Sequence, residues 1–82
     1  MKKVLKKKLF FINGCSKNYF LWEIPEGPGI IYEIVEEFKG HHISRAVLHG
    51  LYLQKEKALT AFKRLINHEA HRLPLTRTLA MG

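Results

Sequence analysis

The chain has 82 residues, of which 46% are hydrophobic, and this is enough for one small folded core but not for two. Fourteen Lys and Arg residues stand against seven acidic residues, all of them Glu, which gives a net charge of +7. The apolar content excludes a disordered chain, the lack of Asp excludes a Ser/His/Asp triad, and the positive charge favours polyanionic partners.

The N-terminal part of the chain is predicted to form a β-hairpin. Residues 4–12 are rich in β-forming side chains toward their end, and Asn13-Gly14 follows as the strongest short signal for a tight type I′ turn. Residues 15–24 then form the returning strand, which is apolar on both faces. We expect the face that carries Phe20 and Trp22 to contribute to the core.

A loop is predicted at residues 25–29, because two prolines and two glycines within five positions do not continue a helix or a strand. Residues 30–38 fit both an amphipathic helix and a strand. Their β-branched content favours the strand, and Glu36 and Glu37 would lie near a helix C-terminus, where the helix dipole disfavours acids. We therefore prefer a strand for residues 30–38.

Residues 41–53 are predicted to return as a further strand after a turn at Lys39-Gly40. Gly50 within this strand indicates a β-bulge or a close approach of another backbone. On a regular alternation, one side of the strand would carry Ile43, Arg45, Val47, His49, Leu51 and Leu53.

An amphipathic helix is predicted from residue 54 or 55 to about residue 73, ended by Pro74. Its apolar stripe consists of Ala58, Leu59, Phe62, Leu65, Ile66, Ala70 and Leu73. The solvent side, at 100° per residue, carries Lys57, Arg64, His68 and His71. Residues 75–82 have no usable periodicity and are interpreted as a flexible tail.

These elements predict an α+β fold: a small antiparallel sheet of three to four strands, built from two hairpins and covered by one long C-terminal amphipathic helix. Residues 1–74 are expected to form a single domain. A sheet of this size leaves open edges, so a homodimer is a further expectation.

Cysteine usage and the N-terminal residues bear on the cellular compartment. Cys15 is the only cysteine, so no disulfide can form within the chain and a reducing compartment is favoured. The cationic start resembles an export signal. The apolar core of a signal peptide, however, has roughly 7–15 residues, and the apolar run here covers only residues 9–12. We expect a cytoplasmic protein that does not enter a membrane.

Histidines are the first candidates for chemistry, but their pattern is weak. The helical segment His68-Glu69-Ala70-His71 places its histidines three apart, whereas the zinc-protease helix needs a spacing of four. A ribonuclease that uses histidines and Arg45 is an alternative, because His41, His42 and His49 lie in the same segment. We nevertheless expect a non-catalytic protein that holds no metal or cofactor.

Nucleic acid, DNA or RNA, is the preferred partner because the charge along the chain is segregated. Residues 1–22 carry six lysines and no acid, whereas residues 23–38 carry five glutamates and no base. Three tyrosines at strand positions, Tyr19, Tyr32 and Tyr52, are candidates for stacking on bases. The candidate phosphate-binding residues are Lys6, Lys7, Lys8, Arg45, Lys57, Lys63 and Arg64.

The alternative function is a small protein-binding inhibitor or adaptor, for example a phage or mobile-element antagonist of a host nuclease or defence protein. The acidic segment from Glu23 to Glu37 could then mimic the phosphates of a nucleic acid. Capture of a specific protein partner after nuclease treatment would distinguish this alternative from nucleic-acid binding.

Overall fold

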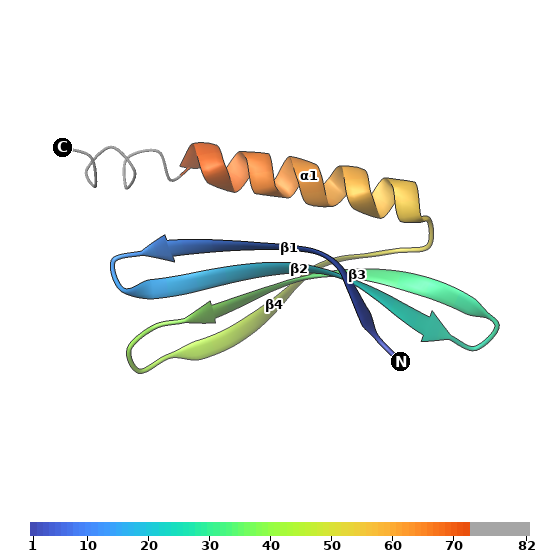
Figure 1. The fold of residues 1–82 in the computed structure, drawn as a ribbon, viewed down its shortest axis with the longest axis horizontal. Coiled ribbons are helices and arrows are strands. Elements are labelled where there is room, and N and C mark those ends of the chain that lie inside the picture. Colours follow the sequence, from blue (N-terminus) through green and yellow to red (C-terminus); the bar gives the residue numbers. More distant parts are fainter. Residues whose placement is uncertain (73–82) are drawn as a thin grey trace.

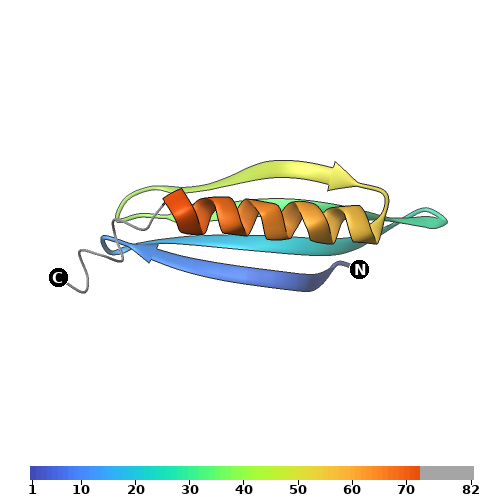
Figure 2. The same cartoon turned by 90° about the horizontal axis from the view of Figure 1, so that it is seen from above.

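The computed structural model describes residues 1–72 and shows one antiparallel sheet with a helix packed on one of its faces (Figures 1 and 2). The sheet has the strand order β1-β2-β3-β4. The elements are β1 (Lys3–Ile12), β2 (Cys15–Glu26), β3 (Gly29–Lys39), β4 (Ser44–Tyr52) and α1 (Lys55–Arg72). The predicted α+β fold is confirmed, with four strands. The predicted helix end at Pro74 and the tail of residues 75–82 lie outside the described residues.

Tight turns join the first three strands. Asn13 and Gly14 have φ angles of 49° and 80°, as a type I′ turn requires, so the predicted hairpin is confirmed. The loop predicted at residues 25–29 is wrong in its extent, since only Gly27 and Pro28 form the turn and Glu26 already pairs with Gly29. Gly27 makes this short connection possible through its φ of 56°. The two predicted hairpins, β1–β2 and β3–β4, are present, and the tight turn between β2 and β3 joins them into one continuous meander.

Pro25 is accommodated within β2 because the pairing with the neighbouring strand β1 ends before it. It pairs with Ile30 of β3, whereas the pairing of β1 with β2 extends only as far as Glu23. No ladder hydrogen bond is therefore required from the nitrogen of Pro25 on the β1 side. The strand preferred for residues 30–38 is confirmed as the central part of β3.

The core lies between the sheet and α1, on the face of β2 that holds Tyr19 and Leu21. These two side chains are 1% and 0% exposed, and they pack with Tyr32, Ile34, Ala58 and Phe62. The expectation that Phe20 and Trp22 form the core is wrong, because α1 covers the opposite face of the sheet. Both faces of β2 are apolar, so alternation alone could not select the covered one.

A bulge at His49 changes the alternation of β4. Gly50 pairs with Ile34 and Leu48 pairs with Val35, which leaves His49 as the extra residue, next to the predicted glycine. His49 thus points to the helix side of the sheet, where its Nε2 lies 2.8 Å from Oε1 of Glu36. The bulge also moves Leu51 to the opposite face, so the expectation of one regular side over residues 43–53 is wrong.

The helix begins after Gln54, whose carbonyl oxygen accepts a hydrogen bond from the amide of Ala58 at 3.1 Å. Glu56 in the first turn and Arg72 in the last turn complement the helix dipole. As predicted, the helix buries Ala58 and Phe62 and partly buries Leu59, Leu65 and Ile66, while Lys57, Arg64, His68 and His71 are exposed.

Candidate nucleic-acid interface

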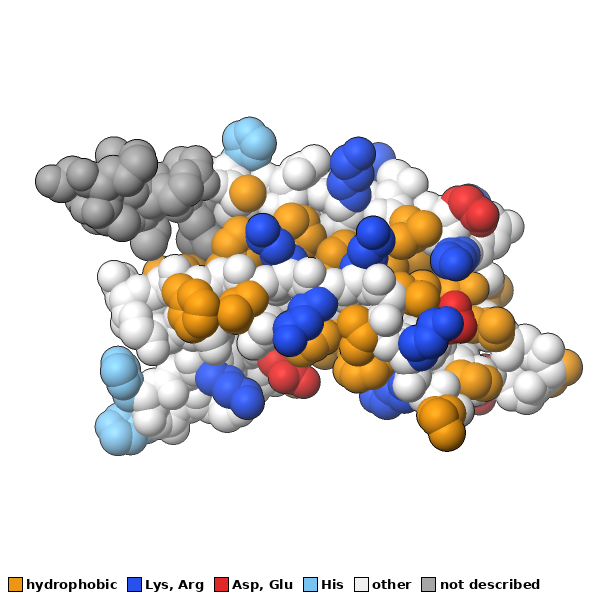
Figure 3. Space-filling model, in the orientation of Figure 1, with side chains coloured by type: hydrophobic (Ala, Val, Ile, Leu, Met, Phe, Trp, Pro, Cys, Tyr) orange, Lys and Arg blue, Asp and Glu red, His pale blue; other side chains and the backbone are white. Residues whose placement is uncertain are grey.

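A groove with basic walls runs between β1 and α1. One wall is formed by the consecutive lysines Lys6, Lys7 and Lys8 of β1, and Lys63 stands on the helix wall. The floor and the remaining helix wall contain Leu59, Phe62, Ile66 and Asn67, and the groove has a volume of about 520 Å³. Figure 3 shows Lys and Arg side chains on both sides of the line along which α1 meets the sheet.

The register of β1 explains why its lysines reach the helix. A bulge at Leu5 separates the pair Val4–Trp22 from the pair Lys6–Leu21, so that Leu5 packs against the core and Lys6 lies on the same side. Lys8 pairs with Tyr19 and also shares the helix side. Lys7 points to the other face, where its ammonium lies 5.8 Å from the ring centre of Phe20. The edge strand therefore presents positive charge to both sides of the sheet.

The groove lysines are not neutralised by acids. Within residues 1–72, the ion pairs involve Lys3, Lys17, His49 and Arg72, and none involves Lys6, Lys7, Lys8 or Lys63. Exposed charges of one sign along a groove attract polyanions over a distance of about 10 Å at moderate salt. Lys6, Lys8 and Lys63 are therefore available to an anionic ligand in the groove, whereas the ammonium of Lys7 lies on the opposite face of the sheet.

A network of charges, buried except for Arg72, holds the end of α1 on the sheet and so determines the position of the groove wall. Lys17 of β2 lies 3.2 Å from Glu69 of α1 and 3.7 Å from Glu36 of β3, and Arg72 lies 3.4 Å from Glu69. Burial alone would raise the pKa of Glu69, but the hydrogen bond from Tyr19 and the contacts with Lys17 and Arg72 lower it. The Glu69 carboxylate therefore stays charged at neutral pH.

Tyr19 completes this network. Burial, the hydrogen bond to Glu69 and the nearby carboxylates raise the pKa of its phenol far above the usual value. The hydroxyl thus remains protonated and donates to Glu69.

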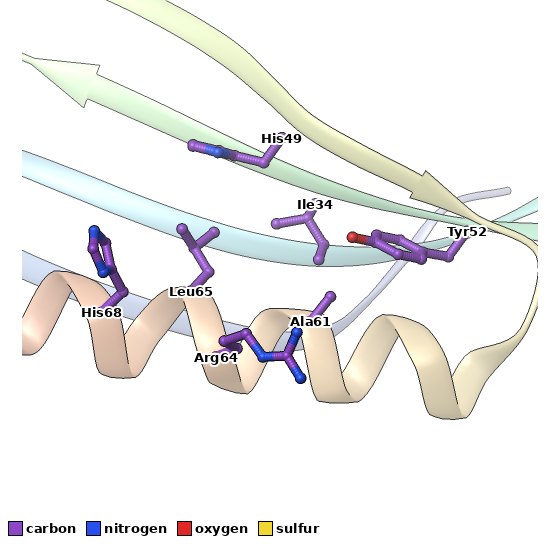
Figure 4. A pocket seen from close by; sticks show the side chains of 7 residues that line it. All are labelled: Ile34, His49, Tyr52, Ala61, Arg64, Leu65 and His68. Carbon is purple, nitrogen blue, oxygen red and sulfur yellow. The ribbon is translucent and has the colours of Figure 1, made fainter.

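On the other side of α1, a second hollow of about 390 Å³ lies between the helix and β4 (Figure 4). Arg64 and His68 of α1 face His49 and Tyr52 of β4 across it. An adjoining hollow of about 330 Å³ is lined by Lys57 and Arg64 together with Glu56. The exposed side of α1 therefore carries basic residues along its length, and these residues lie next to β1 on one side and β4 on the other.

The structure places the seven candidate residues in three groups. Lys6, Lys8 and Lys63 meet in the β1–α1 groove, which Lys7 also lines although its ammonium lies on the other face of the sheet, whereas Lys57 and Arg64 line the hollows on the β4 side. Arg45 lies apart from them on β4, with its guanidinium 5.4 Å from the ring centre of Phe38. Asn67 in the groove was missed by the sequence reasoning, although its position four residues after Lys63 places it on the same side of the helix.

Two of the three tyrosines considered for base stacking are wrong candidates. Tyr19 and Tyr32 are buried in the core, and only Tyr52 is partly exposed. Their position follows from the side of the sheet that α1 covers, which strand alternation could not indicate.

The acidic segment does not form a continuous surface. Glu36 is buried against Lys17 and His49, and Glu23 pairs with Lys3 at 3.9 Å. Glu33 and Glu37 point to the face opposite α1, since they pair with Trp22 and Asn18 of β2. The glutamates are thus divided between the two faces of the sheet.

The histidines do not converge on a metal-binding geometry. In the described part of the chain, no three His, Cys, Asp or Glu side chains lie close enough to hold a metal ion. In the segment that resembles a zinc-protease helix, Glu69 is buried, and Nδ1 of His71 lies 2.7 Å from the carbonyl oxygen of Asn67, to which it donates.

No protein-family model, curated protein or solved structure matched this chain when it was compared with them. Among residues 1–72, no helix has the length and apolar character needed to cross a membrane.

Proposed function

We propose that this protein is a small, non-catalytic nucleic-acid-binding module of the cytoplasm that holds a phosphate backbone in the groove between β1 and α1. The observation that carries the proposal is the meeting of Lys6, Lys8 and Lys63 at one groove, although β1 and α1 are distant in the sequence. These lysines form no ion pair in residues 1–72, so phosphates would be their first strong counterions.

The basic residues on the β4 side of the helix support the same function. Arg64 and Lys57 extend the positive surface around α1. A nucleic acid whose phosphate backbone lies in the groove would therefore contact further cations where it passes over the helix. Among residues 1–72, the buried Phe62 is the only aromatic residue that lines the groove. Binding should therefore depend on phosphates more than on base identity, and it should be weakly selective for sequence.

The test is a salt titration of binding to a labelled DNA duplex and to an RNA of the same sequence. A protein that neutralises about four phosphates should show a slope of about −4 in a plot of log K against log salt concentration. This slope corresponds to an affinity loss of about two hundred-fold between about 50 and 200 mM salt. Absence of binding to both nucleic acids at low salt would refute the proposal.

The alternative of a protein-binding inhibitor that mimics phosphates has less support, because Glu36 is buried and Glu33 and Glu37 share their face with apolar side chains. If nucleic acid does not bind and a specific protein is retained from a nuclease-treated lysate, this alternative replaces the proposed function. Loss of that capture on replacing Glu33 and Glu37 by Gln would then identify the acidic residues as the contact.

A further inference from the structure

The face of the sheet opposite α1 is left uncovered by residues 1–72 (Figure 1). All four strands contribute apolar side chains to this open face, and several are strongly exposed, including Phe11 at 72% and Leu48 at 54%. The strand register assigns to the open face Val4, Leu9, Phe11, Phe20, Trp22, Ile24, Ile31, Val35, Leu48 and Leu51.

The apolar side chains of the open face form adjacent rows across the sheet. One row runs from Val4 and Trp22 through Glu33 of β3 to Leu51, and the next begins with Lys7 of β1 and continues through Phe20, Val35 and Leu48. The rings of Phe20 and Trp22 stack with their centres 5.7 Å apart and join the two rows. A largely apolar surface that extends over all four strands, with only Lys7 and Glu33 as charged residues in these two rows, is typical of a protein interface and not of the free surface of a monomer.

The chemistry of the open face does not suit a nucleic acid. Most of its apolar residues are aliphatic, and aliphatic side chains do not stack on bases as aromatic rings do. Glu33 and Glu37 also lie on this face and would repel phosphates. The open face and the basic groove thus suit different partners.

The charges of the open face suit a second copy of the same chain. On this face Lys7 and Lys39, together with Lys2, whose ammonium lies 5.0 Å from the ring centre of Trp22, balance Glu26, Glu33 and Glu37, although the chain as a whole carries +7. Two copies related by a two-fold axis can therefore approach through this face without the repulsion that the groove side would cause. The two-fold axis also allows acids of one copy to meet lysines of the other.

The size of the face is sufficient for a stable contact. Strands of about ten residues extend about 33 Å, and four strands about 4.8 Å apart span about 19 Å. This gives about 600 Å² of sheet per copy and about 1,200 Å² in a dimer, at the lower end of specific interfaces.

We propose that the protein forms a homodimer in which the open faces of two sheets pack against each other. The two helices and their basic grooves then lie on the outer sides of a four-layer assembly, in which two aligned sheets are about 10 Å apart. The dimer does not depend on nucleic-acid binding, but it would carry two grooves and bind a long polyanion at two sites.

The proposal is tested by light scattering coupled to size-exclusion chromatography of the full chain at micromolar to millimolar concentration. The expected mass is twice the chain mass of 9.6 kDa. Leu48→Lys should halve this mass while the far-ultraviolet circular dichroism stays unchanged, because it places a charge within the open face. The matched control is Val47→Lys, since Val47 is the neighbouring residue of β4, is 41% exposed and points to the other face.

Trp22 supplies a second measurement, because it is the only tryptophan and lies on the open face. On dilution, its emission in the wild type and in Val47→Lys should shift to longer wavelength, whereas Leu48→Lys should show the shifted spectrum at every concentration. A monomeric mass for the wild type over the whole range would overturn the proposal. A dimer that Leu48→Lys leaves intact would also overturn it and would indicate pairing through the strand edges.

Discussion

The ammonium group of Lys17 on β2 lies 3.2 Å from Oε1 of Glu69 on α1, and the two side chains are only 15% and 5% exposed. This contact joins residues 52 positions apart and fixes the C-terminal half of the helix on the sheet. The helix consequently lies where Lys63 faces the lysines of β1, so a buried ion pair positions the wall of the proposed binding groove.

Replacing Lys17 by Met should lower the free energy of unfolding by about 3 kcal/mol, because Glu69 and Glu36 would keep buried charges without their shared cation. Urea denaturation measures this loss. The matched control is Lys3→Met, which removes an exposed partner of Glu23 and should cost less than about 1 kcal/mol. Equal losses of free energy in the two variants would show that the buried Lys17–Glu69 pair stabilises the fold no more than the exposed Lys3–Glu23 pair does.

Acid should weaken the protein through Glu69. The pKa of Glu69 is lower in the folded protein than its usual value of 4.5, so the charged carboxylate stabilises the fold fully above about pH 4.5. That contribution is lost as the pH falls through the folded pKa. The free energy of unfolding, measured from neutral to acidic pH, should therefore fall less steeply in Glu69→Gln than in the wild type, from a lower value at neutral pH. Parallel curves would contradict this role of Glu69.

The first hairpin turn depends on the positive φ of Gly14. Gly14→Ala should cost about 1–2 kcal/mol, because a Cβ disfavours the left-handed backbone with its φ of 80°. Gly29→Ala is the matched control: Gly29 has no positive φ, and an added Cβ would meet its nearest neighbour at 3.9 Å. The melting temperatures of the two variants are compared. Equal values would show that a side chain at residue 14 does not destabilise the turn.

The local elements of this fold could be predicted from the sequence because their signals are local. The Asn13-Gly14 turn, the strand at residues 30–38 and the apolar stripe around Phe62 each depend on neighbouring residues. The covered face of β2 could not be predicted in this way, because Phe20 and Trp22 make one face as apolar as Tyr19 and Leu21 make the other.

The sequence predicted which basic residues belong to the candidate site, but it did not predict how they are arranged in space. Lys6, Lys8 and Lys63 were selected for their charge alone, and their meeting at one groove depends on which sheet edge α1 approaches. That placement relies on the Lys17–Glu69 pair, for which no sequence spacing provides a signal. Arg45 was selected by the same criterion and lies elsewhere, against Phe38.

The most direct test of the proposed groove compares two double variants that remove the same charge. Lys6→Gln/Lys63→Gln removes one lysine from each groove wall, whereas Arg45→Gln/Lys55→Gln removes two exposed basic residues that do not line the groove. The measurement is the salt dependence of binding to one DNA duplex. The groove variant should reduce the magnitude of the log–log slope by about 2, and the control should leave it nearly unchanged. Equal slopes and equal affinities in the two variants would show that net charge, and not the groove between β1 and α1, binds the nucleic acid.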